Sequence, residues 1–241
     1  MKTILAIAVC LVFMVCSWVL VHYKLWERIS IFATQPVFGK NWKNEVDKQK
    51  TLYYGTAADL IFLGDSHMEQ CEWQEVFSGL RTTNRGIGGE STEGLHARIS
   101  VLPPGDSTKV LFLQIGINDL LGGRKPADVL SSYKNILDQI AVRRYTVVPT
   151  LVFYVRYIPE INPLVTELNQ LIQAELLQRK IPFIDLNSII AENETLLRPY
   201  SADGVHLSAA GYQKWIEKMN AFIPKNGPVS GYPSEKNRTK E

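Results

Sequence analysis

The chain has 241 residues, 46% of them hydrophobic and 21% charged, which suffices for one well-buried domain with short extensions. Its 26 basic and 24 acidic residues are scattered and give a formal net charge of +2, so nothing in the charge indicates a nucleic-acid partner. Cys10 and Cys16 lie in an apolar N-terminal run. Cys71 therefore stands alone in the remaining chain, where it can form neither an internal disulfide nor a thiolate metal site.

The apolar N-terminal run, ILAIAVCLVFMVCSWVLV, covers residues 4–21, carries no charge and follows Lys2. Its length is about that of a helix that crosses a bilayer. We therefore predict one N-terminal transmembrane helix, a signal anchor over residues 1–26, in a single-pass membrane protein. A cleaved secretory signal is the alternative, although the run is long and bulky and no clear small-x-small site follows it.

The orientation of this predicted anchor is not decided by charge. Lys24 and Arg28 follow the run and compete with Lys2 and the free amino terminus before it. We favour an extracytoplasmic position for the rest of the chain, because the run also has the character of an export signal.

Three further segments follow the predicted anchor. Residues 27–50 have mixed composition and are expected to form a connector, and residues 51–224 are expected to form the globular domain. Residues 225–241 are polar and rich in turn formers, and we expect this tail to be disordered.

The globular segment alternates between apolar runs and stretches with helical periodicity. Continuous apolar strands separated by helices are typical of a parallel sheet that is covered on both faces. The predicted strands are 60–63, 82–85, 110–115, 147–155 and 182–186, and the predicted helices are 67–77, 91–102, 127–143, 161–179 and 209–222.

The first predicted strand leads into a turn that contains a serine. Residues 60–69 read LIFLGDSHME, an apolar run that turns at Gly-Asp-Ser and continues as a helix-compatible segment. This order places the Ser66 hydroxyl at the carboxyl end of a buried strand, the edge where ligands bind in open α/β sheets. The simpler interpretation is a helix N-cap, whose hydroxyl accepts a hydrogen bond from a backbone N–H.

A second polar loop precedes the last predicted helix. Residues 201–208 read SADGVHLS and place Asp203 and His206 three residues apart. If the loop curls, the carboxylate can meet one imidazole nitrogen and leave the other to take a proton from a serine nucleophile. Taken singly, Asp203 could be a turn residue and His206 a capping or core residue.

Two glycine-containing loops are expected at neighbouring strand ends. Residues 84–91 read NRGIGGES, and their glycines allow close backbone approach and unusual dihedral angles. This loop lacks the lysine of a P-loop and the full dinucleotide fingerprint. Residues 114–119 read QIGIND, and the Asn118 amide can donate to an oxyanion. Simple turn chemistry is the alternative for both loops.

These four blocks, taken together and in this order, resemble the SGNH (GDSL-type) hydrolase family over residues 60–222. The segment GIGGEST resembles versions found in the platelet-activating-factor acetylhydrolase-like, short-chain esterase branch. The matching residues are Gly64-Asp65-Ser66, Gly89, Gly116-x-Asn118-Asp119 and Asp203-x-x-His206.

The resemblance implies a single three-layer αβα domain with a mostly parallel five-stranded sheet, of SGNH or flavodoxin-like type. It implies that Ser66 is the nucleophile, His206 the general base and Asp203 the acid that orients it. The implied oxyanion hole consists of the Ser66 and Gly89 backbone N–H groups and the Asn118 side chain.

The implied activity is that of a serine esterase, a hydrolase or lipase acting on short-chain acyl esters of a lipid or glycan, with acetyl as one candidate. The same residues would serve a membrane-anchored O-acyltransferase, and a non-catalytic binding module on the same scaffold is a third hypothesis. The resemblance implies no cofactor. The 4 histidines form no His/Asp/Glu cluster at ligand spacing, so we predict no metal site.

One residue departs from the family pattern. His67 follows the serine where many members carry Leu or Ile. If its ring faces the site, it could line the substrate mouth or influence nearby proton affinities. The alternative is an ordinary polar position in the first turn of a helix.

Overall fold

The computed structural model describes residues 15, 18, 40–53, 58–102 and 110–223. Phe38–Glu241 is one compact unit and Met1–Val37 another, and the fold below belongs to the former. Apart from Val15 and Trp18, the predicted anchor and the predicted tail lie outside the described residues. Among the residues that are described, no helix combines the length and apolarity that a bilayer crossing requires.

The centre of the domain is a four-stranded sheet in the order β2-β1-β3-β4, and all neighbouring strands run parallel. The strands are β1 (Leu60–Gly64), β2 (Thr82–Gly86), β3 (Val110–Gln114) and β4 (Val147–Pro149). Every residue of β1 and β3 is buried, as expected for continuous apolar runs covered on both faces. The αβα class predicted from the sequence is therefore confirmed.

The predicted fifth strand is reduced to a single parallel bridge between Thr150 and Ile184. Ile184 donates to the Pro149 carbonyl at 2.8 Å and accepts from the Leu151 N–H at 3.0 Å. Pro182 has no N–H to extend this pairing, and the next helix begins at Asn187. The prediction of five full strands was therefore wrong by one strand.

The strand predicted over residues 147–155 ends early, at Pro149. Beyond it, buried asparagine side chains replace the sheet partner. Asn169 bonds both backbone groups of Val152 at 2.8 Å, and Asn162 bonds those of Val155 at 2.9 and 2.8 Å. The backbone groups of Val152 and Val155 are thus bonded without being part of a strand, which apolarity alone could not reveal.

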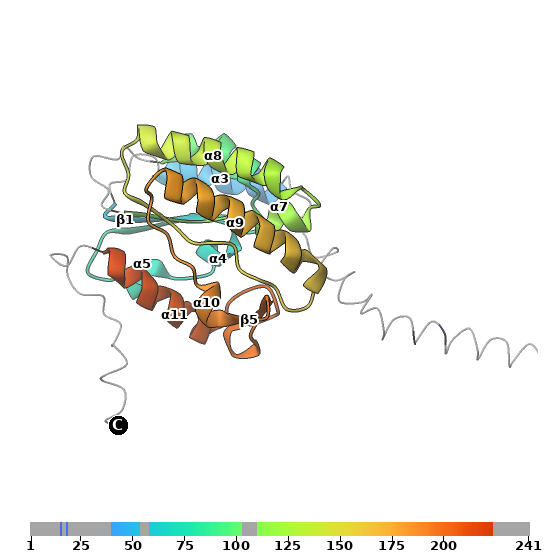
Figure 1. The fold of residues 1–241 in the computed structure, drawn as a ribbon. Helices are drawn as coiled ribbons and strands as arrows, with labels where there is room; N and C mark the ends of the chain where they lie inside the picture. The colour runs from blue at the N-terminus through green and yellow to red at the C-terminus, as the bar shows by residue number, and fades with distance from the viewer. Residues whose placement is uncertain (1–14, 16–17, 19–39, 54–57, 103–109, 224–241) are drawn as a thin grey trace, which may run out of the picture. The chain divides into compact units, whose positions relative to one another are not determined.

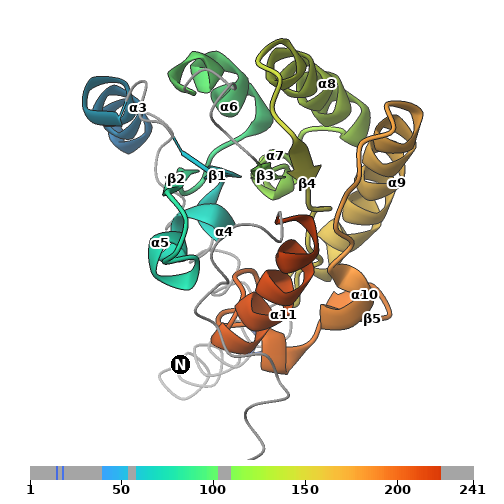
Figure 2. The same cartoon turned by 90° about the vertical axis from the view of Figure 1, so that its left-hand side faces the viewer.

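Helices cover both faces of the sheet (Figures 1 and 2). α6, α8 and α9 pack on one face, and α4, α5, α10 and α11 pack on the other. A short antiparallel hairpin, β5 with β6, lies outside the main sheet. The bounds are α3 Lys40–Tyr53, α4 Ser66–Glu69, α5 Trp73–Val76, α6 Thr92–Arg98, α7 Ile117–Leu121, α8 Pro126–Val142, α9 Asn162–Gln178, α10 Asn187–Ile190, α11 Ala209–Met219, β5 Ala191–Glu192 and β6 Thr195–Leu196.

The helix predicted over residues 67–77 is two short helices, α4 and α5. The Asn84 amide, at the middle of β2, donates to the carbonyls of Met68, Glu69 and Cys71 at 2.9, 3.2 and 3.2 Å. Trp73 Nε1 also donates to the Met68 carbonyl at 2.7 Å. These side chains take carbonyls that a continuous helix would need, so the chain turns between the two helices.

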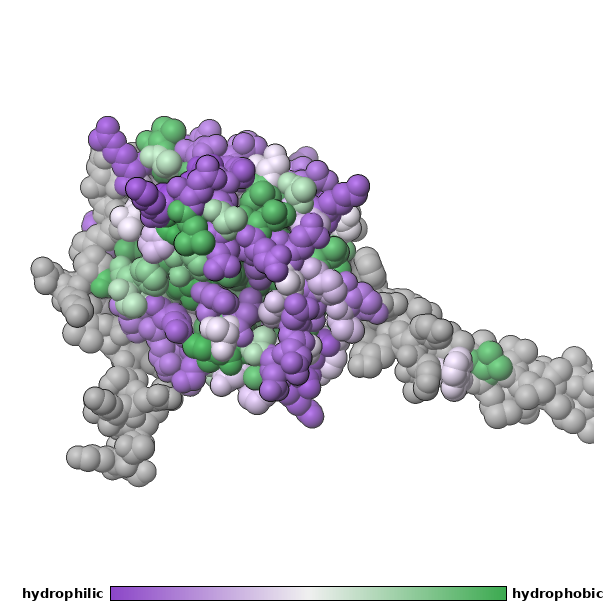
Figure 3. All heavy atoms as spheres, in the orientation of Figure 1, coloured by the Kyte–Doolittle hydropathy of each residue, from purple (hydrophilic) through white to green (hydrophobic). Residues whose placement is uncertain are grey.

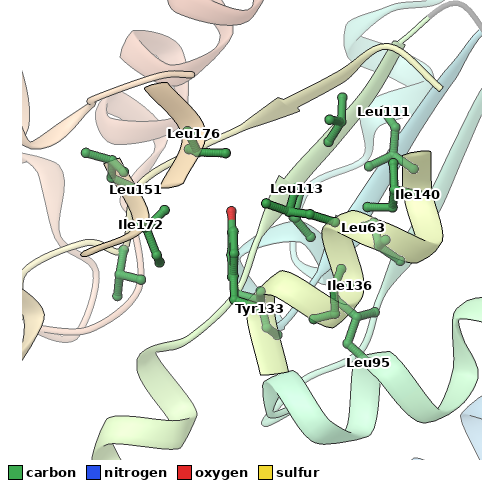
Figure 4. Close-up of a cluster of buried hydrophobic side chains, with 14 of the residues drawn as sticks. Leu63, Leu95, Leu111, Leu113, Tyr133, Ile136, Ile140, Leu151, Ile172 and Leu176 are labelled. Carbon is green, nitrogen blue, oxygen red and sulfur yellow. The ribbon is translucent and has the colours of Figure 1, made fainter. Parts of the chain in front are cut away.

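The two faces of the sheet have different cores. Leucine and isoleucine side chains from β1, β3, α6, α8 and α9 fill one face, where Tyr133 joins them (Figure 4). The other contains most of the buried aromatic rings, with Phe62 stacked on Trp73 at a centroid distance of 4.1 Å. On the face drawn in Figure 3, hydrophobic residues appear as small separate areas among hydrophilic ones.

Helix α3 lies largely in the segment predicted as a connector, and the predicted boundary at residue 51 falls inside it. Trp42 Nε1 donates to Glu90 Oε1 at 2.8 Å, and Gln49 Oε1 accepts from Arg98 Nη1 at 3.1 Å. These side-chain contacts attach α3 to the loop after β2 and to α6.

Gly64 ends β1 in a conformation that only glycine fits. Its φ is +152°, and a Cβ added there would lie 1.9 Å from the Gln114 carbonyl oxygen of β3. We expect Gly64→Ala to lower the free energy of unfolding by about 3 kcal/mol or more, because backbone must move to admit the methyl group. Urea unfolding monitored by circular dichroism measures this change.

Gly123→Ala is the matched control. Gly123 has a φ of +83° and nothing within 4 Å of an added Cβ, so the substitution introduces only backbone strain. A loss of about 1 kcal/mol is expected. Equal losses for the two variants would contradict the close approach of β1 and β3.

Candidate active site

The Ser66 side chain lies at the carboxyl end of β1, one of the two inner strands of the sheet. Gly64 ends β1, Asp65 caps α4, and Ser66 is the first residue of that helix. Asp65 Oδ1 accepts a hydrogen bond from the His67 backbone N–H at 3.0 Å, which makes Asp65, not Ser66, the N-cap. The capping role considered for Ser66 thus belongs to its neighbour.

The structure brings Ser66 together with Asp203 and His206, which are more than 130 residues away in the chain. Ser66 Oγ lies 2.9 Å from His206 Nε2, and His206 Nδ1 lies 2.6 Å from Asp203 Oδ2. A carboxylate accepts, so Nδ1 carries a hydrogen and Nε2 of the neutral ring accepts from the serine hydroxyl. This is the arrangement in which an imidazole can remove the hydroxyl proton.

The loop before α11 holds Asp203 and His206 by local hydrogen bonds. Asp203 Oδ1 accepts from the backbone N–H groups of Val205 and His206 at 2.9 and 2.8 Å. Ser201 Oγ accepts from the Gly204 N–H at 2.6 Å, and Ser201 forms a bridge with Leu207. One carboxylate therefore both shapes the loop and contacts the imidazole.

The contact between Asp203 and His206 changes the pKa of both side chains. The hydrogen bond with Asp203 raises the pKa of His206 above its ordinary value, against the opposing effect of partial burial. Partial burial alone would raise the pKa of Asp203, but hydrogen bonds from the His206 ring and backbone outweigh it and hold the pKa below its usual range. The contact therefore favours the carboxylate form of Asp203 and makes the neutral His206 ring a stronger proton acceptor.

The two loops expected to supply oxyanion donors begin at the same sheet edge. Gly64 pairs with Gly86 of β2 and with Gln114 of β3, so the three loops leave the sheet at one level. Gly89 has a φ of +73°, a value that suits glycine. Asn118, in α7, donates from Nδ2 to the Glu90 carbonyl at 3.1 Å, and its amide has a second hydrogen for a ligand.

A buried ion pair that the sequence reasoning missed supports this edge. Glu90 and Arg98 are both fully buried. Arg98 Nε donates to Glu90 Oε1 at 2.6 Å, Arg98 Nη2 contacts the other carboxylate oxygen, and Arg98 Nη2 also donates to the Arg85 carbonyl at 2.7 Å. The sequence signal for this ion pair is Arg98 itself, which lies three residues after Leu95 on the buried side of α6.

A second buried carboxylate connects the starts of α6 and α7. Asp119 accepts from the Thr92 N–H at 2.9 Å and the Thr92 hydroxyl at 2.7 Å, and Arg124 Nη1 lies 2.5 Å from it. These bonds fix Asp119 and hence the backbone of its neighbour Asn118. Asp119 therefore links the starts of two helices.

His67 does not line the mouth of the site, contrary to the first alternative considered for it. Its side chain is 1% exposed, with Nδ1 3.1 Å from Asp65 Oδ1 and Nε2 3.1 Å from the Val205 carbonyl oxygen. Its ring meets Phe153 edge to face at a centroid distance of 5.0 Å. Asp65 and Val205, on opposite sides of the ring, hold the His67 side chain in the protein interior.

The described part of the chain contains no group of three or more His, Cys, Asp or Glu side chains placed to hold a metal ion.

A serine, a histidine and an acid gathered at the carboxyl edge of a parallel α/β sheet have the geometry that acyl-transfer chemistry requires. The chain belongs to the GDSL-like Lipase/Acylhydrolase family, whose sequence profile matches residues 62–214. The family predicted from the four sequence blocks is therefore confirmed.

Known proteins with different names are similar to parts of this chain. Platelet-activating factor acetylhydrolase IB subunit alpha1 of Bos taurus is 28% identical over 179 residues, which cover 68% of this chain and 75% of that protein. N-acylneuraminate cytidylyltransferase of Streptococcus agalactiae is 24% identical over 119 residues, so the match spans only 29% of its length and 46% of this chain. The solved structure of a GDSL-like lipase from Bacteroides thetaiotaomicron has a TM-score of 0.62 at 20% identity and covers 76% of this chain and 97% of that one.

The shifted ionisation of His206 can be measured without reference to activity. We expect its imidazole to titrate above the ordinary value near 6.5, because the Asp203 carboxylate favours the protonated ring. Asp203→Asn keeps the size of the side chain but removes its charge, so the His206 midpoint should fall. The pH dependence of the His206 ring resonances in NMR spectra measures both midpoints.

Asp47→Asn, at an exposed position of α3, is the control and should leave the His206 midpoint unchanged. A midpoint that rises or does not move in Asp203→Asn would contradict the assigned contact.

Proposed function

We propose that the chain is a serine esterase that hydrolyses short-chain acyl esters of a lipid or glycan by a Ser-His-Asp mechanism, with acetyl as the first candidate acyl group. The observation that carries the proposal is the 2.9 Å contact between Ser66 Oγ and His206 Nε2, with Asp203 behind the ring at 2.6 Å. A serine hydroxyl is a weak nucleophile until a base in hydrogen-bond contact can take its proton.

In the first half of the proposed reaction, Ser66 Oγ attacks the ester carbonyl carbon while His206 Nε2 takes the hydroxyl proton. The carbonyl oxygen becomes an oxyanion that accepts from the Ser66 and Gly89 N–H groups and from Asn118. The intermediate then breaks its bond to the alcohol, and His206 returns the proton to the departing oxygen. This leaves an acyl group on Ser66 and a neutral imidazole.

In the second half, water replaces the alcohol. His206 Nε2 takes a proton from the water as its oxygen attacks the acyl carbon, and the second intermediate expels Ser66, which regains its proton from His206. Asp203 stabilises the imidazolium in both halves because its carboxylate accepts from Nδ1 throughout. The products are one carboxylic acid and one alcohol, and the chain is unchanged.

The proposed preference for short acyl groups rests on the relative from Bos taurus, an acetylhydrolase by name, with which this chain shares 28% of 179 aligned residues. The segment GIGGEST, in the loop that carries Gly89, supports the same branch of the family. A panel of p-nitrophenyl esters of increasing chain length would rank the acyl groups directly.

Substitution of the nucleophile or the base should abolish hydrolysis of p-nitrophenyl acetate. We expect Ser66→Ala and His206→Ala to lower kcat by roughly 10³-fold or more, because each leaves the carbonyl without an activated nucleophile. Asn118→Ala should lower kcat by about 10²-fold through loss of one oxyanion donor. Release of p-nitrophenol is measured spectrophotometrically, with circular dichroism to verify folding.

Ser188→Ala is the matched serine control, since the Ser188 hydroxyl contacts only the Asp185 carbonyl at an exposed position. It should retain full activity. Full activity in Ser66→Ala would refute the proposed mechanism. Exclusive transfer of the acyl group to an added sugar, without release of acid, would instead favour an acyltransferase that uses the same residues.

We also propose that the uncharged run at residues 4–21 anchors the chain in a membrane, with the hydrolase domain on the extracytoplasmic side. The full chain should then stay with the membrane pellet after alkaline carbonate extraction, and external protease should reach the domain in intact cells. Recovery in the supernatant with a new amino terminus after the run would favour the cleaved signal.

A further inference from the structure

The buried His67 ring lies between two hydrogen-bond acceptors, the Asp65 carboxylate and the Val205 carbonyl. Its ring is 1% exposed, and the Asp65 carboxylate on the Nδ1 side is fully buried. On the other side, Nε2 lies 3.1 Å from the Val205 carbonyl oxygen. A carbonyl oxygen only accepts, so Nε2 carries a hydrogen and donates it to Val205.

The acceptor of this bond is the carbonyl of the peptide unit that joins Val205 to His206. The N–H of the same peptide unit donates to Asp203 Oδ1 at 2.8 Å. The peptide plane that precedes His206 is therefore held on both edges, by Asp203 at its N–H and by His67 at its C=O. Its orientation determines where the His206 side chain leaves the backbone.

His67 is also rigidly connected to Ser66. The two residues are adjacent in α4, and the His67 N–H donates to the Asp65 cap at 3.0 Å. The Tyr212 hydroxyl of α11 donates to the His67 carbonyl at 2.8 Å. The His67 backbone is thus fixed to the turn that carries the serine and to the helix that follows the histidine loop.

We propose that His67 is a positioning residue that sets the distance between Ser66 and His206 by its hydrogen bond to the Val205 carbonyl. The inference rests on the proposed esterase function, since it assigns His67 a task in the same reaction. His67 would act through His206, whose ring lies beside its own at a centroid distance of 5.4 Å. Without this bond, the carbonyl of the peptide before His206 loses its hydrogen bond from α4, while the N–H of that peptide stays bonded to Asp203. A misplacement of the imidazole by about 1 Å can lower a rate by about 10²-fold.

Two variants with the same amide group distinguish the contact of His67 with Asp65 from its contact with Val205. In His67→Gln the amide nitrogen reaches about as far as Nε2 and can still donate to Val205. In His67→Asn the amide ends near the position of Nδ1, so it can bond Asp65 but not Val205. We expect kcat for p-nitrophenyl acetate to fall about 10²-fold in His67→Asn and less than about 10-fold in His67→Gln, with KM within about twofold of the starting value.

Rates should be expressed per active serine, counted by complete labelling of Ser66 with a fluorophosphonate probe, so that loss of folded protein does not count as loss of kcat. Equal kcat values for the two variants, or full kcat in His67→Asn, would overturn the positioning role. Full activity in Ser66→Ala, measured alongside, would instead overturn the proposed function.

A measurement on the unaltered chain covers the case in which a variant does not fold. Long-range ¹H–¹⁵N correlation spectra of the histidine rings report which nitrogen carries hydrogen. We expect the His67 Nε2 resonance to be that of a protonated nitrogen. An unprotonated Nε2 could not donate to the Val205 carbonyl and would overturn the proposal.

Discussion

The register of three parallel strands is the constraint on which the site depends. Gly64 of β1 lies opposite Gly86 of β2 and Gln114 of β3, and the missing side chain at Gly64 lets the β3 backbone approach. The serine turn, the glycine loop and the asparagine loop consequently leave the sheet at one level. A shift of one residue in either pairing would move the proposed oxyanion donors relative to the serine by about 3.3 Å.

Two ion pairs fix the loops that follow β2 and β3. The Glu90–Arg98 pair is fully buried beneath the glycine loop, and the Asp119–Arg124 pair lies beside the asparagine loop. Pairs of this kind add little net stability compared with apolar packing, because desolvation opposes the Coulomb attraction. Their effect is on geometry, since each carboxylate accepts several directed hydrogen bonds that fix a loop whose backbone makes few regular contacts.

The features that could be predicted from the sequence are those that depend on the order of elements along the chain. Ser66, the glycine loop and Asn118 each follow a predicted strand, so the alternation of elements places them at one sheet edge. The choice of Gly89 and the meeting of the Asp203–His206 loop with Ser66 were expected from the family resemblance. The end of β4 could not be predicted, because the asparagines that replace its sheet partner come from residues 162 and 169. The inward orientation of His67 depends on a carbonyl 138 residues away.

Helix α3 precedes the first strand, yet its side chains contact residues next to the proposed oxyanion donors. Trp42 donates to Glu90, whose carbonyl accepts from Asn118, and Gln49 bonds the arginine that neutralises Glu90. The segment contributes no residue to the hydrolase motifs. Substitutions of Trp42 or Gln49 should therefore disturb the loop that carries Gly89 as well as α3 itself. The folded unit thus begins before its sheet and includes a helix that lies outside the family match at residues 62–214.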